Sequence, residues 1–393
     1  MTSDVVIIGA GASGLMCAME AGRRGRSVLV LDHSPEIGRK IIVSGGGRCN
    51  FTNRNVSREH YLSGNPHFPV SAFSRYTPED FVALLERHGI GYHEREAGQL
   101  FCNESSRQIV RMLKAECDRA SVQFILGCSI QEVRRIGDQG SVRFTVDSDQ
   151  GVFDCRSLVI ATGGLSWPGL GATNFGHALA KKLGIRVTPL RPALTPVRFS
   201  RQDAERFSAL SGISIQAAVR SEGAQFTGDV LFTHRGLSGP AILQLSSYWD
   251  GESAIEMDLA PKLDLVSWFS AKRGSRMHLA NLLGQFLPDR LARLWCELQC
   301  KSKPLCQYTS REMDGIVRHL RRWEIRPAGT EGFNKAEVTL GGVDTRELSS
   351  KTMECRKVPG LHFTGEVLDV TGQLGGYNLH WAWASGHAAG QAV

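Results

Sequence analysis

Several features that mark membrane, exported or metal-binding proteins are missing from this chain of 393 residues. No stretch approaches about 20 uninterrupted apolar residues, which excludes a transmembrane helix. The apolar run Val5 to Ile8 lacks a basic segment before it and is soon broken by glycine, so it predicts no signal peptide. The ten cysteines include no C-x-x-C pair, and Cys296 and Cys300 lie one helical turn apart, as packing residues would. We therefore expect reduced thiols, no bound metal and a cytoplasmic protein.

Internal repeats and low-complexity segments are also absent, and 42% hydrophobic with 22% charged residues is ordinary globular composition. The net charge of +7 permits an anionic partner without requiring one. The densest basic clusters, residues 23–26 and 318–326, lie on expected helices and lack the interleaved aromatics of a base-stacking surface. We expect a small-molecule substrate rather than a nucleic acid, no membrane partner, and no indication of oligomeric state.

The first 32 residues carry the clearest chemistry. An apolar strand leads into Gly9-Ala-Gly-Ala-Ser-Gly14, a helix follows over 15–24, and a second strand ends at Asp32. Gly9 permits a sharp turn, Gly11 lets the backbone approach a pyrophosphate, and Gly14 lets helix and strand pack closely. Helix N–H groups then hold the phosphates, and Asp32 accepts from the adenosine ribose. A carboxylate there repels a 2′-phosphate, so FAD or NAD fits better than NADP.

The next segment favours FAD over NAD. Instead of further strand–helix units, the chain enters Gly38-Arg-Lys and then Ser44-Gly-Gly-Gly-Arg-Cys-Asn50, a loop suited to lie flat against a flavin. A strand ending in Thr162-Gly-Gly164 predicts a turn near the phosphates. Gly365-Glu-Val-Leu-Asp369 offers a carboxylate for the ribityl hydroxyls. The turn Gly375 to Asn378 precedes a helix, expected from about Trp381, whose dipole would stabilise anionic reduced flavin.

Together with Ala161-Thr-Gly-Gly-Leu-Ser and Phe232-Thr-His-Arg-Gly-Leu-Ser-Gly-Pro240, these motifs resemble a bacterial flavoprotein family that includes aminoacetone oxidase and BaiN-like enzymes linked to bile-acid reduction. The resemblance covers essentially the whole chain and implies an FAD-binding Rossmann domain split by an insert. This chain departs from the family pattern at Trp167, Thr371 and residues 174–176. The predicted cofactor-binding residues, from the motifs and the resemblance together, are Gly9, Gly11, Ala12, Ser13, Gly14, Asp32, Arg39, Lys40, Ser44, Gly45, Gly46, Gly47, Arg48, Cys49, Asn50, Thr162, Gly163, Gly164, Gly365, Glu366, Asp369, Gly375, Gly376, Tyr377 and Asn378.

The predicted fold is α/β: a discontinuous Rossmann-type FAD-binding domain over 1–190 and 336–393, with an inserted domain at 191–335. Short strands at 197–199, 213–219, 225–232 and 254–258 predict a β unit over 191–262, and apolar spacing predicts helices within 263–335. Residues 232–240 are expected to form a loop facing the flavin.

We expect an FAD-dependent oxidoreductase that transfers a hydride between flavin N5 and a small organic substrate, by amine oxidation or enone reduction. His234, Tyr377 and Cys49 are the candidates for proton transfer; a redox role for Cys49 would need a second cysteine nearby. The chain has one dinucleotide fingerprint, so NAD(P)H would bind transiently on the flavin face as reductant, or oxygen would accept electrons. Two alternatives stay open: a flavin-dependent RNA-modifying enzyme, and a non-catalytic redox-responsive flavoprotein.

Overall fold

The first sheet is organised around the buried apolar run at the N-terminus. Val5, Val6 and Ile7 are fully buried in β1 (Thr2–Ile8), because this strand has neighbours on both sides. The parallel strands around it are β2 (Val28–Asp32), β7 (Gln123–Leu126), β10 (Gly151–Ile160) and β20 (Leu361–Phe363), in the order β7-β2-β1-β10-β20. Their carboxyl ends meet at one edge of the sheet, which is where ligands bind in folds of this kind.

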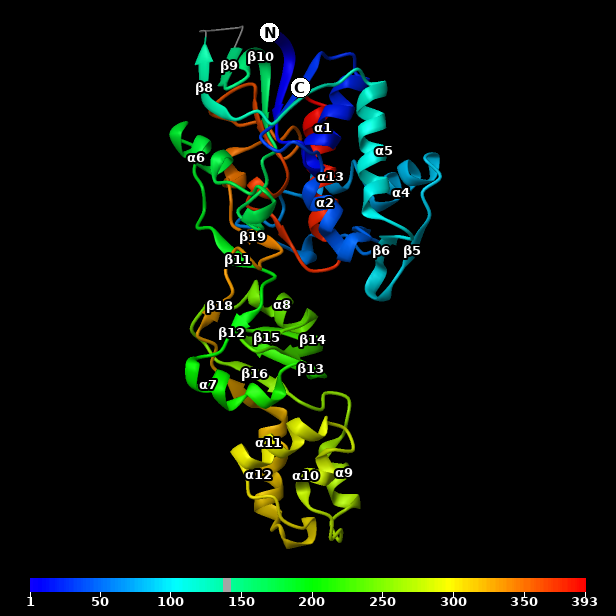
Figure 1. The fold of residues 1–393 in the computed structure, drawn as a ribbon, viewed down its shortest axis with the longest axis vertical. Coiled ribbons are helices and arrows are strands. Elements are labelled where there is room, and N and C mark those ends of the chain that lie inside the picture. The colour runs from blue at the N-terminus through cyan, green and yellow to red at the C-terminus, as the bar shows by residue number, and fades with distance from the viewer. Residues whose placement is uncertain (137–142) are drawn as a thin grey trace. The chain divides into compact units, whose positions relative to one another are not determined.

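The computed structural model describes residues 1–136 and 143–393, which divide into two compact units. The first unit comprises residues 1–191 and 338–393, and the second comprises residues 192–337. The boundaries expected from the sequence lie within two residues of these. The fold class is confirmed: a discontinuous Rossmann-type α/β domain carries an inserted domain that is β-rich and helical (Figure 1).

Different parts of strand β10 pair with two different strands, β9 and β20. Its first half pairs antiparallel with β9 (Arg143–Ser148), which pairs in turn with β8 (Ile130–Ile136). Its last residues pair in parallel with β20, which belongs to the C-terminal segment. The chain therefore returns to the same sheet after the insert, and this places the motifs at residues 161–166 and 365–369 beside each other.

Helices α1 (Ala12–Arg23), α5 (Ser106–Arg119) and α13 (Tyr377–Gly390) gather on one side of this sheet (Figure 1). Glycines in α13 let it approach α1 closely: a Cβ at Gly386 would lie 2.4 Å from the Ser13 carbonyl oxygen. The shorter helices of the unit are α2 (Arg39–Val43), α3 (Val70–Phe73), α4 (Pro78–Arg87) and α6 (Phe175–Lys182). Within the described residues, no helix is both long and apolar enough to cross a membrane.

Two small sheets complete the first unit and connect distant segments. The strands β3 (Asn50–Asn53), β5 (Tyr92–Glu94) and β6 (Gln99–Cys102) form one of them, in the order β3-β6-β5. The other pairs β4 (Tyr61–Leu62) with β21 (Thr371–Gly372). Strand β19 (Val338–Leu340) brings the chain back from the insert. The segment that follows β3 is thereby fixed next to the C-terminal segment that contains β21.

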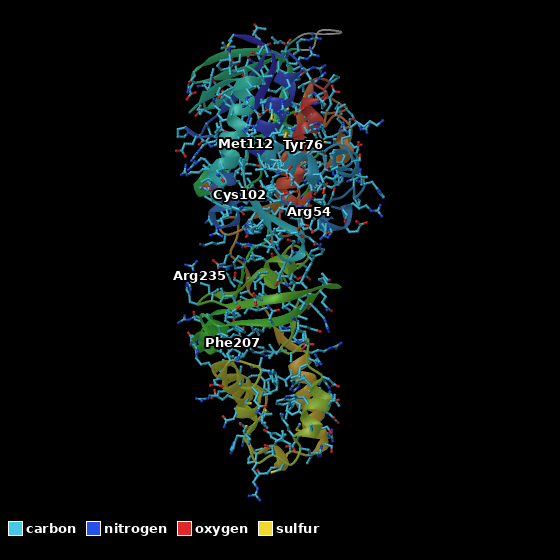
Figure 2. All side chains as sticks on the ribbon, turned by 90° about the vertical axis from the view of Figure 1, so that its right-hand side faces the viewer. Arg54, Tyr76, Cys102, Met112, Phe207 and Arg235 are labelled. Carbon is cyan, nitrogen blue, oxygen red and sulfur yellow. The ribbon has the colours of Figure 1, made fainter. Side chains whose placement is uncertain are left out.

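The second unit contains a seven-stranded sheet and a group of helices. The sheet order is β17-β16-β13-β14-β15-β12-β18, formed by β12 (Val197–Arg198), β13 (Ser214–Ser221), β14 (Ala224–Phe232), β15 (Gly236–Ser238), β16 (Ile255–Asp258), β17 (Trp323–Ile325) and β18 (Gly329–Thr330). Strand β11 (Arg191–Ala193) leads into the unit, and the helices are α7 (Arg201–Arg206), α8 (Pro240–Ser246), α9 (Leu265–Ala271), α10 (Leu279–Leu283), α11 (Asp289–Gln299) and α12 (Ser310–Arg321). Phe207, labelled in Figure 2, meets Trp323 edge-on in its core, with ring centroids 5.7 Å apart.

Three sequence-based expectations about secondary structure are wrong. Residues 232–240 are not simply a loop, because β15 pairs with both β14 and β12 there. The helical part does not run to residue 335, because β17 and β18 rejoin the sheet. The last helix begins at Tyr377 rather than Trp381, because Gly376 adopts a φ of 95° and acts as its N-cap. Each error concerns a strand of two or three residues or a cap, where periodicity carries no signal.

Candidate flavin site

The turn after β1 contains three different glycine environments. Gly9 has a φ of 115°, and a Cβ there would lie 2.3 Å from the Ala161 carbonyl oxygen. At Gly14 a Cβ would lie 1.9 Å from the Gly9 carbonyl oxygen, so helix and turn pack too closely for any side chain. At Gly11 nothing lies within 4 Å of the corresponding position. The backbone is therefore open at Gly11, beside the N-terminus of α1, where a pyrophosphate would bind.

Asp32 ends β2 beside this turn, and backbone groups hold its carboxylate. Oδ2 accepts a hydrogen bond from the N–H of Ala10 at 2.6 Å, and Oδ1 accepts one from the N–H of Ser34 at 2.7 Å. Each oxygen keeps a second acceptor site, and the side chain is 14% exposed. The carboxylate is thus oriented in advance and still able to accept from a ribose hydroxyl.

The glycine-rich segment forms a tight turn with an open face. Ser44–Gly47 is a short 3₁₀ turn in which all three glycines have positive φ. A Cβ at Gly45 would lie 2.7 Å from the Asn50 backbone nitrogen, so one side of the turn is packed. At Gly46 and Gly47 nothing lies within 4 Å, so the other side is bare backbone. A broad planar ring system can lie against such a surface.

Cys49 closes this turn and is inert rather than activated. Its side chain is fully buried, and its backbone φ of 48° is in the left-handed region. Burial raises the pKa of its thiol to about 12, although a hydrogen bond with Ser44 works in the opposite direction. Burial likewise raises the pKa of the nearby Cys102 to about 12. The second cysteine that a redox role would need is present, but both thiols stay protonated.

A polar network joins three segments that are remote in sequence. Lys40 Nζ lies 2.7 Å from Glu366 Oε2 and donates to Ser166 Oγ at 2.8 Å. Ser166 Oγ in turn donates to Glu366 Oε1 at 2.7 Å. The Thr339 N–H donates to the same oxygen at 2.9 Å. Burial would raise the pKa of Glu366, but the Lys40 charge and these hydrogen bonds hold it below its ordinary value, so the carboxylate is ionised.

The small-residue turn after β10 is packed on one side and open on the other. A Cβ at Gly164 would lie 2.4 Å from Thr339 Oγ1, so no side chain is tolerated there. Gly163 has a φ of 72° with nothing within 4 Å of its Cβ position. The buried Thr162 hydroxyl has no hydrogen-bond partner among the residues that the structure describes. A Cβ at Gly176 would lie 2.4 Å from this oxygen, so the hydroxyl lies on the packed side of the turn, against α6.

The C-terminal turn is pinned to the strand that follows the glycine-rich turn. Asn53 Nδ2 donates to the Gly375 carbonyl oxygen at 2.9 Å, and a Cβ at Gly376 would lie 2.4 Å from the Thr52 carbonyl oxygen. Asn378 Oδ1 accepts from the Gly372 N–H at 2.8 Å and stabilises the approach to the helix. The N-terminus of α13 is therefore presented beside the glycine-rich turn, where its partial positive charge favours an anion.

Tyr377, the first residue of α13, forms an aromatic pair that the sequence did not reveal. Its ring stacks on His60, with centroids 4.4 Å apart and planes 13° from parallel. Tyr61 donates its hydroxyl proton to the Tyr377 carbonyl oxygen at 2.9 Å. Burial raises the pKa of Tyr377 and lowers the pKa of His60, so both side chains are neutral near pH 7. A phenol and a neutral imidazole therefore stand at the helix end.

The remaining predicted residues take different positions. Gly365 has a φ of 74° and approaches Ser13, where a Cβ would lie 2.6 Å from Oγ. Asp369 Oδ2 accepts from the Gly64 N–H at 3.0 Å, and burial raises the pKa of this carboxyl group. Arg48 is exposed. His234 belongs to the second unit, so its role beside the flavin stays a prediction.

Hydrogen bonds and close backbone approaches bring four predicted segments together: residues 9–14, 32–50, 161–166 and 365–378. Ser166, Thr339 and His60 were missed as site residues. Ser166 lies within a quoted motif and could have been chosen, whereas no sequence pattern marks Thr339 or His60. The bare glycine backbone, the oriented Asp32 carboxylate and the N-terminus of α13 fit the pyrophosphate, ribose and ring system of FAD.

The fold and this arrangement of turns define a flavin-dependent oxidoreductase of the Rossmann type. The chain belongs to the family described as HI0933-like protein Rossmann domain, which it matches over residues 3–392.

Individual relatives refine this picture. The chain is 47% identical to the ribosomal RNA dihydrouridine synthase of Escherichia coli K12, over 99% of this chain and 97% of that protein. It is 28% identical to the 3-dehydro-bile acid delta(4,6)-reductase of Clostridium scindens, over 98% of each. The resemblance to the bile-acid branch is thus confirmed, while neither of these relatives is named an aminoacetone oxidase. Among solved structures, the apo Sdh1 complex of Mycobacterium smegmatis, at 19% identity and a TM-score of 0.50 over 99% of this chain and 67% of that chain, shares the fold.

Proposed function

We propose that this protein is an FAD-dependent reductase that converts a uridine of ribosomal RNA into dihydrouridine. The observation that carries the proposal is the 47% identity to a ribosomal RNA dihydrouridine synthase along nearly the full length of both proteins. The sequence alone favoured a small-molecule substrate and kept RNA modification as an alternative. The identity to this ribosomal RNA dihydrouridine synthase now favours RNA as the substrate.

Uracil suits the chemistry of this site. Its C5=C6 double bond is conjugated with the C4 carbonyl group, so its reduction is an enone reduction, the class of reaction expected from the sequence. FAD bound at this site would, in its reduced form, supply the hydride that C6 accepts. A proton must then reach C5. The Clostridium scindens relative is likewise named as a reductase.

Residues of this chain would supply the proton and the electrostatic environment. The Tyr377 hydroxyl would be the general acid, because it keeps its proton over the working pH range; burial raises its pKa and so also makes it a weaker acid than a free phenol. His60, stacked on the Tyr377 ring, fixes that ring in place. The N-terminus of α13 favours negative charge on a neighbouring group. The Lys40–Glu366 pair holds the turns that would surround the cofactor.

A reduction also needs an electron donor. The chain contains one dinucleotide fingerprint, and FAD would occupy it. We therefore propose a reduced nicotinamide nucleotide that binds at the flavin face and leaves before the RNA enters.

The test is turnover on RNA that lacks the modification. FAD-loaded protein is mixed anaerobically with NADH or NADPH, and bleaching of the flavin is followed by addition of ribosomal RNA transcribed in vitro. Reoxidation of the flavin, with a gain of two hydrogens at one uridine by mass spectrometry, supports the proposal. A flavin that is reduced but never reoxidised by ribosomal RNA contradicts it.

A small enone is the second candidate substrate, favoured by the 28% identity to the bile-acid reductase over 98% of both chains. The same assay separates the two candidates. Rapid reoxidation by a free 3-keto-4-ene steroid, with none by RNA, would favour the small molecule. Failure of every donor to reduce the flavin would favour a non-catalytic flavoprotein.

A further inference from the structure

The excess positive charge of this chain is concentrated in one part of the second unit. Residues 263–335 contain thirteen Lys and Arg against seven Asp and Glu, which accounts for six of the seven net positive charges of the chain. The other 320 residues are therefore almost neutral. A concentration of positive charge in one region is typical of a surface that binds a polyanion.

Few of these basic side chains are neutralised by acidic neighbours. Lys303 pairs with Glu312, and Arg321 and Arg322 pair with acidic residues of β16. For the exposed Arg273, Arg276, Arg293, Lys301, Arg311, Arg318 and Arg326, no ion pair is formed with any residue that the structure describes. Most of the charge thus remains available to a partner.

A groove between α9 and α12 lies within this basic region. Its volume is about 340 Å³, and its apolar lining comes from Val266 and Phe269 on one helix and Met313 and Val317 on the other. Val266 is 66% exposed, so part of this apolar lining is open to solvent. The groove therefore offers an apolar floor to a partner with a flat, weakly polar face.

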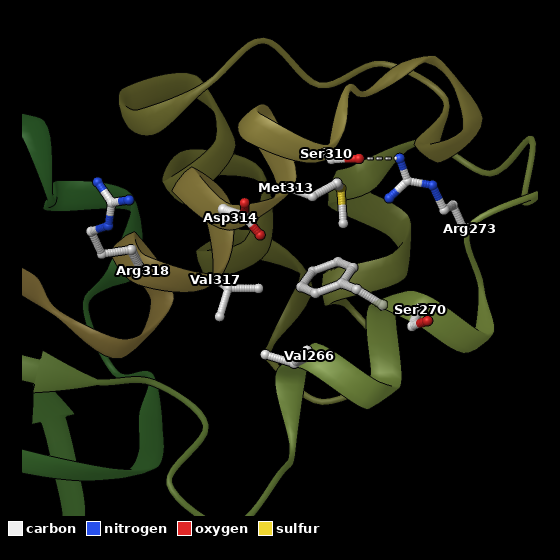
Figure 3. Close-up of a pocket in the computed structure, with 9 residues that line it drawn as sticks. Val266, Ser270, Arg273, Ser310, Met313, Asp314, Val317 and Arg318 are labelled. Atoms are coloured by element: carbon white, nitrogen blue, oxygen red, sulfur yellow. Dashed lines mark hydrogen bonds between the residues drawn. The ribbon is translucent and has the colours of Figure 1, made fainter.

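Two arginines border this floor. Arg273 and Arg318 stand at opposite sides of the groove, and Figure 3 shows the apolar side chains between them. Arg273 donates to Ser310 Oγ at 2.7 Å, which orients its guanidinium group. Asp314 is the one acidic residue of the lining, so the cations outnumber it two to one. Guanidinium groups on both sides of an apolar floor match an unpaired base flanked by its phosphates.

We propose that this groove binds a single-stranded segment of ribosomal RNA, with an unpaired base between α9 and α12 and phosphates on Arg273 and Arg318. The proposal rests on the proposed function for the identity of the RNA. Its support is the charge complementarity between a polyanion and the most basic part of the chain. The region would anchor the substrate while the flavin site performs the reduction.

The test compares variants that change the charge of the groove in both directions. R273A/R318A removes two cations, and D314N removes the opposing anion. R107A/R111A is the matched control, since it removes two exposed cations from α5 in the first unit. For each FAD-loaded protein, the affinity for ribosomal RNA transcribed in vitro is measured at several salt concentrations, together with the rate of flavin reduction by NADPH.

We expect R273A/R318A to bind RNA about tenfold more weakly and to lower the salt slope by about one to two. D314N should bind more tightly, and the control should bind like the wild type. Flavin content and reduction rate should stay unchanged in all variants. Unchanged affinity and slope in R273A/R318A would overturn the proposal, as would a change in self-association that showed the groove to bind a second copy of this chain.

The two proposals fail separately. If the wild type binds RNA through these arginines but forms no dihydrouridine, the activity is wrong and the surface stands. If the wild type forms dihydrouridine and R273A/R318A keeps the same KM for RNA, the surface is wrong and the activity stands.

Discussion

Lys40 and Glu366 lie 326 positions apart in the chain and form an ion pair, with Nζ 2.7 Å from Oε2. Lys40 lies in α2, whereas Glu366 belongs to the segment that returns after the insert. Ser166 contacts both side chains and so connects the turn after β10 to this ion pair. The candidate flavin site is therefore closed by side-chain contacts between segments on both sides of the insert, and each of the three segments depends on the other two.

K40M should destabilise the folded protein in a pH-dependent way. Burial raises the pKa of Glu366, but Lys40 brings it below the ordinary value of 4.5. Because Glu366 ionises at a lower pH in the folded chain than in the unfolded chain, the pair stabilises the fold above about pH 4.5 and loses this effect as the pH falls further. Lys40 is 38% exposed, so solvent screening keeps the coupling small, at about 1 kcal/mol.

This coupling is measured by urea unfolding of the wild type, K40M, E366Q and the double variant. The double-mutant cycle should give a coupling free energy that is smaller at about pH 3 than at neutral pH. Equal coupling at both pH values would show that Glu366 is not the titrating partner.

G11A and G14A should separate cofactor binding from folding. A Cβ at Gly11 meets nothing within 4 Å, so G11A should fold with normal stability but lose FAD, because the methyl group takes the place of the pyrophosphate. A Cβ at Gly14 would lie 1.9 Å from the Gly9 carbonyl oxygen, so G14A should lose about 1–3 kcal/mol of stability. The flavin-to-protein absorbance ratio and the Tm measure the two effects. Full flavin content in G11A would place the pyrophosphate elsewhere.

Y377F should slow RNA reduction while leaving the flavin chemistry intact. The variant keeps the ring that stacks on His60 and removes only the hydroxyl proton. If this hydroxyl protonates C5, dihydrouridine formation should fall about 100-fold, with unchanged flavin reduction by NADPH. Since burial raises the pKa of Tyr377 above 10, any decline in rate that comes from ionisation of Tyr377 should appear only above pH 10.

If His60 rather than Tyr377 donated the proton, the dependence of the rate on pH would differ. Burial lowers its pKa below 6.5, so an imidazolium donor would lose activity as the pH rises through the mildly acidic range. Such a profile, with a larger loss in H60A than in Y377F, would assign the proton to His60 instead.

The parts of the site that could be predicted from the sequence are those that depend on the backbone of one short segment. Gly9, Gly11 and Gly14 each have a distinct local environment, and a short motif encodes all three. The ionic contact of Lys40 with Glu366 could not be predicted, because it depends on how β10 and β20 bring remote segments together. His60 lies next to a two-residue strand in a stretch without periodicity or motif, so nothing in the sequence marked it.

The same distinction explains the errors in the fold. The first two apolar strands, the helix between them and the helices within residues 263–335 were predicted because burial imposes an apolar pattern on them. Strand β15 has three residues and is specified by its pairing with β14 and β12 rather than by its own composition. The early start of α13 depends on the left-handed conformation of Gly376, which is a property of the turn.

Cys49 should be dispensable for turnover despite its place in the glycine-rich turn. Burial raises its thiol pKa to about 12, so the group remains a thiol and is a poor nucleophile near neutral pH. C49A should therefore keep its flavin and reduce RNA at a rate close to that of the wild type. In the native protein, a thiol reagent should react at the exposed Cys306 and at the partly exposed Cys300, whose pKa is lowered by its hydrogen bond with Cys296, and C49A should leave this fast phase unchanged. A loss of about 100-fold in C49A with full flavin content would instead make this thiol the proton donor and remove that role from Tyr377.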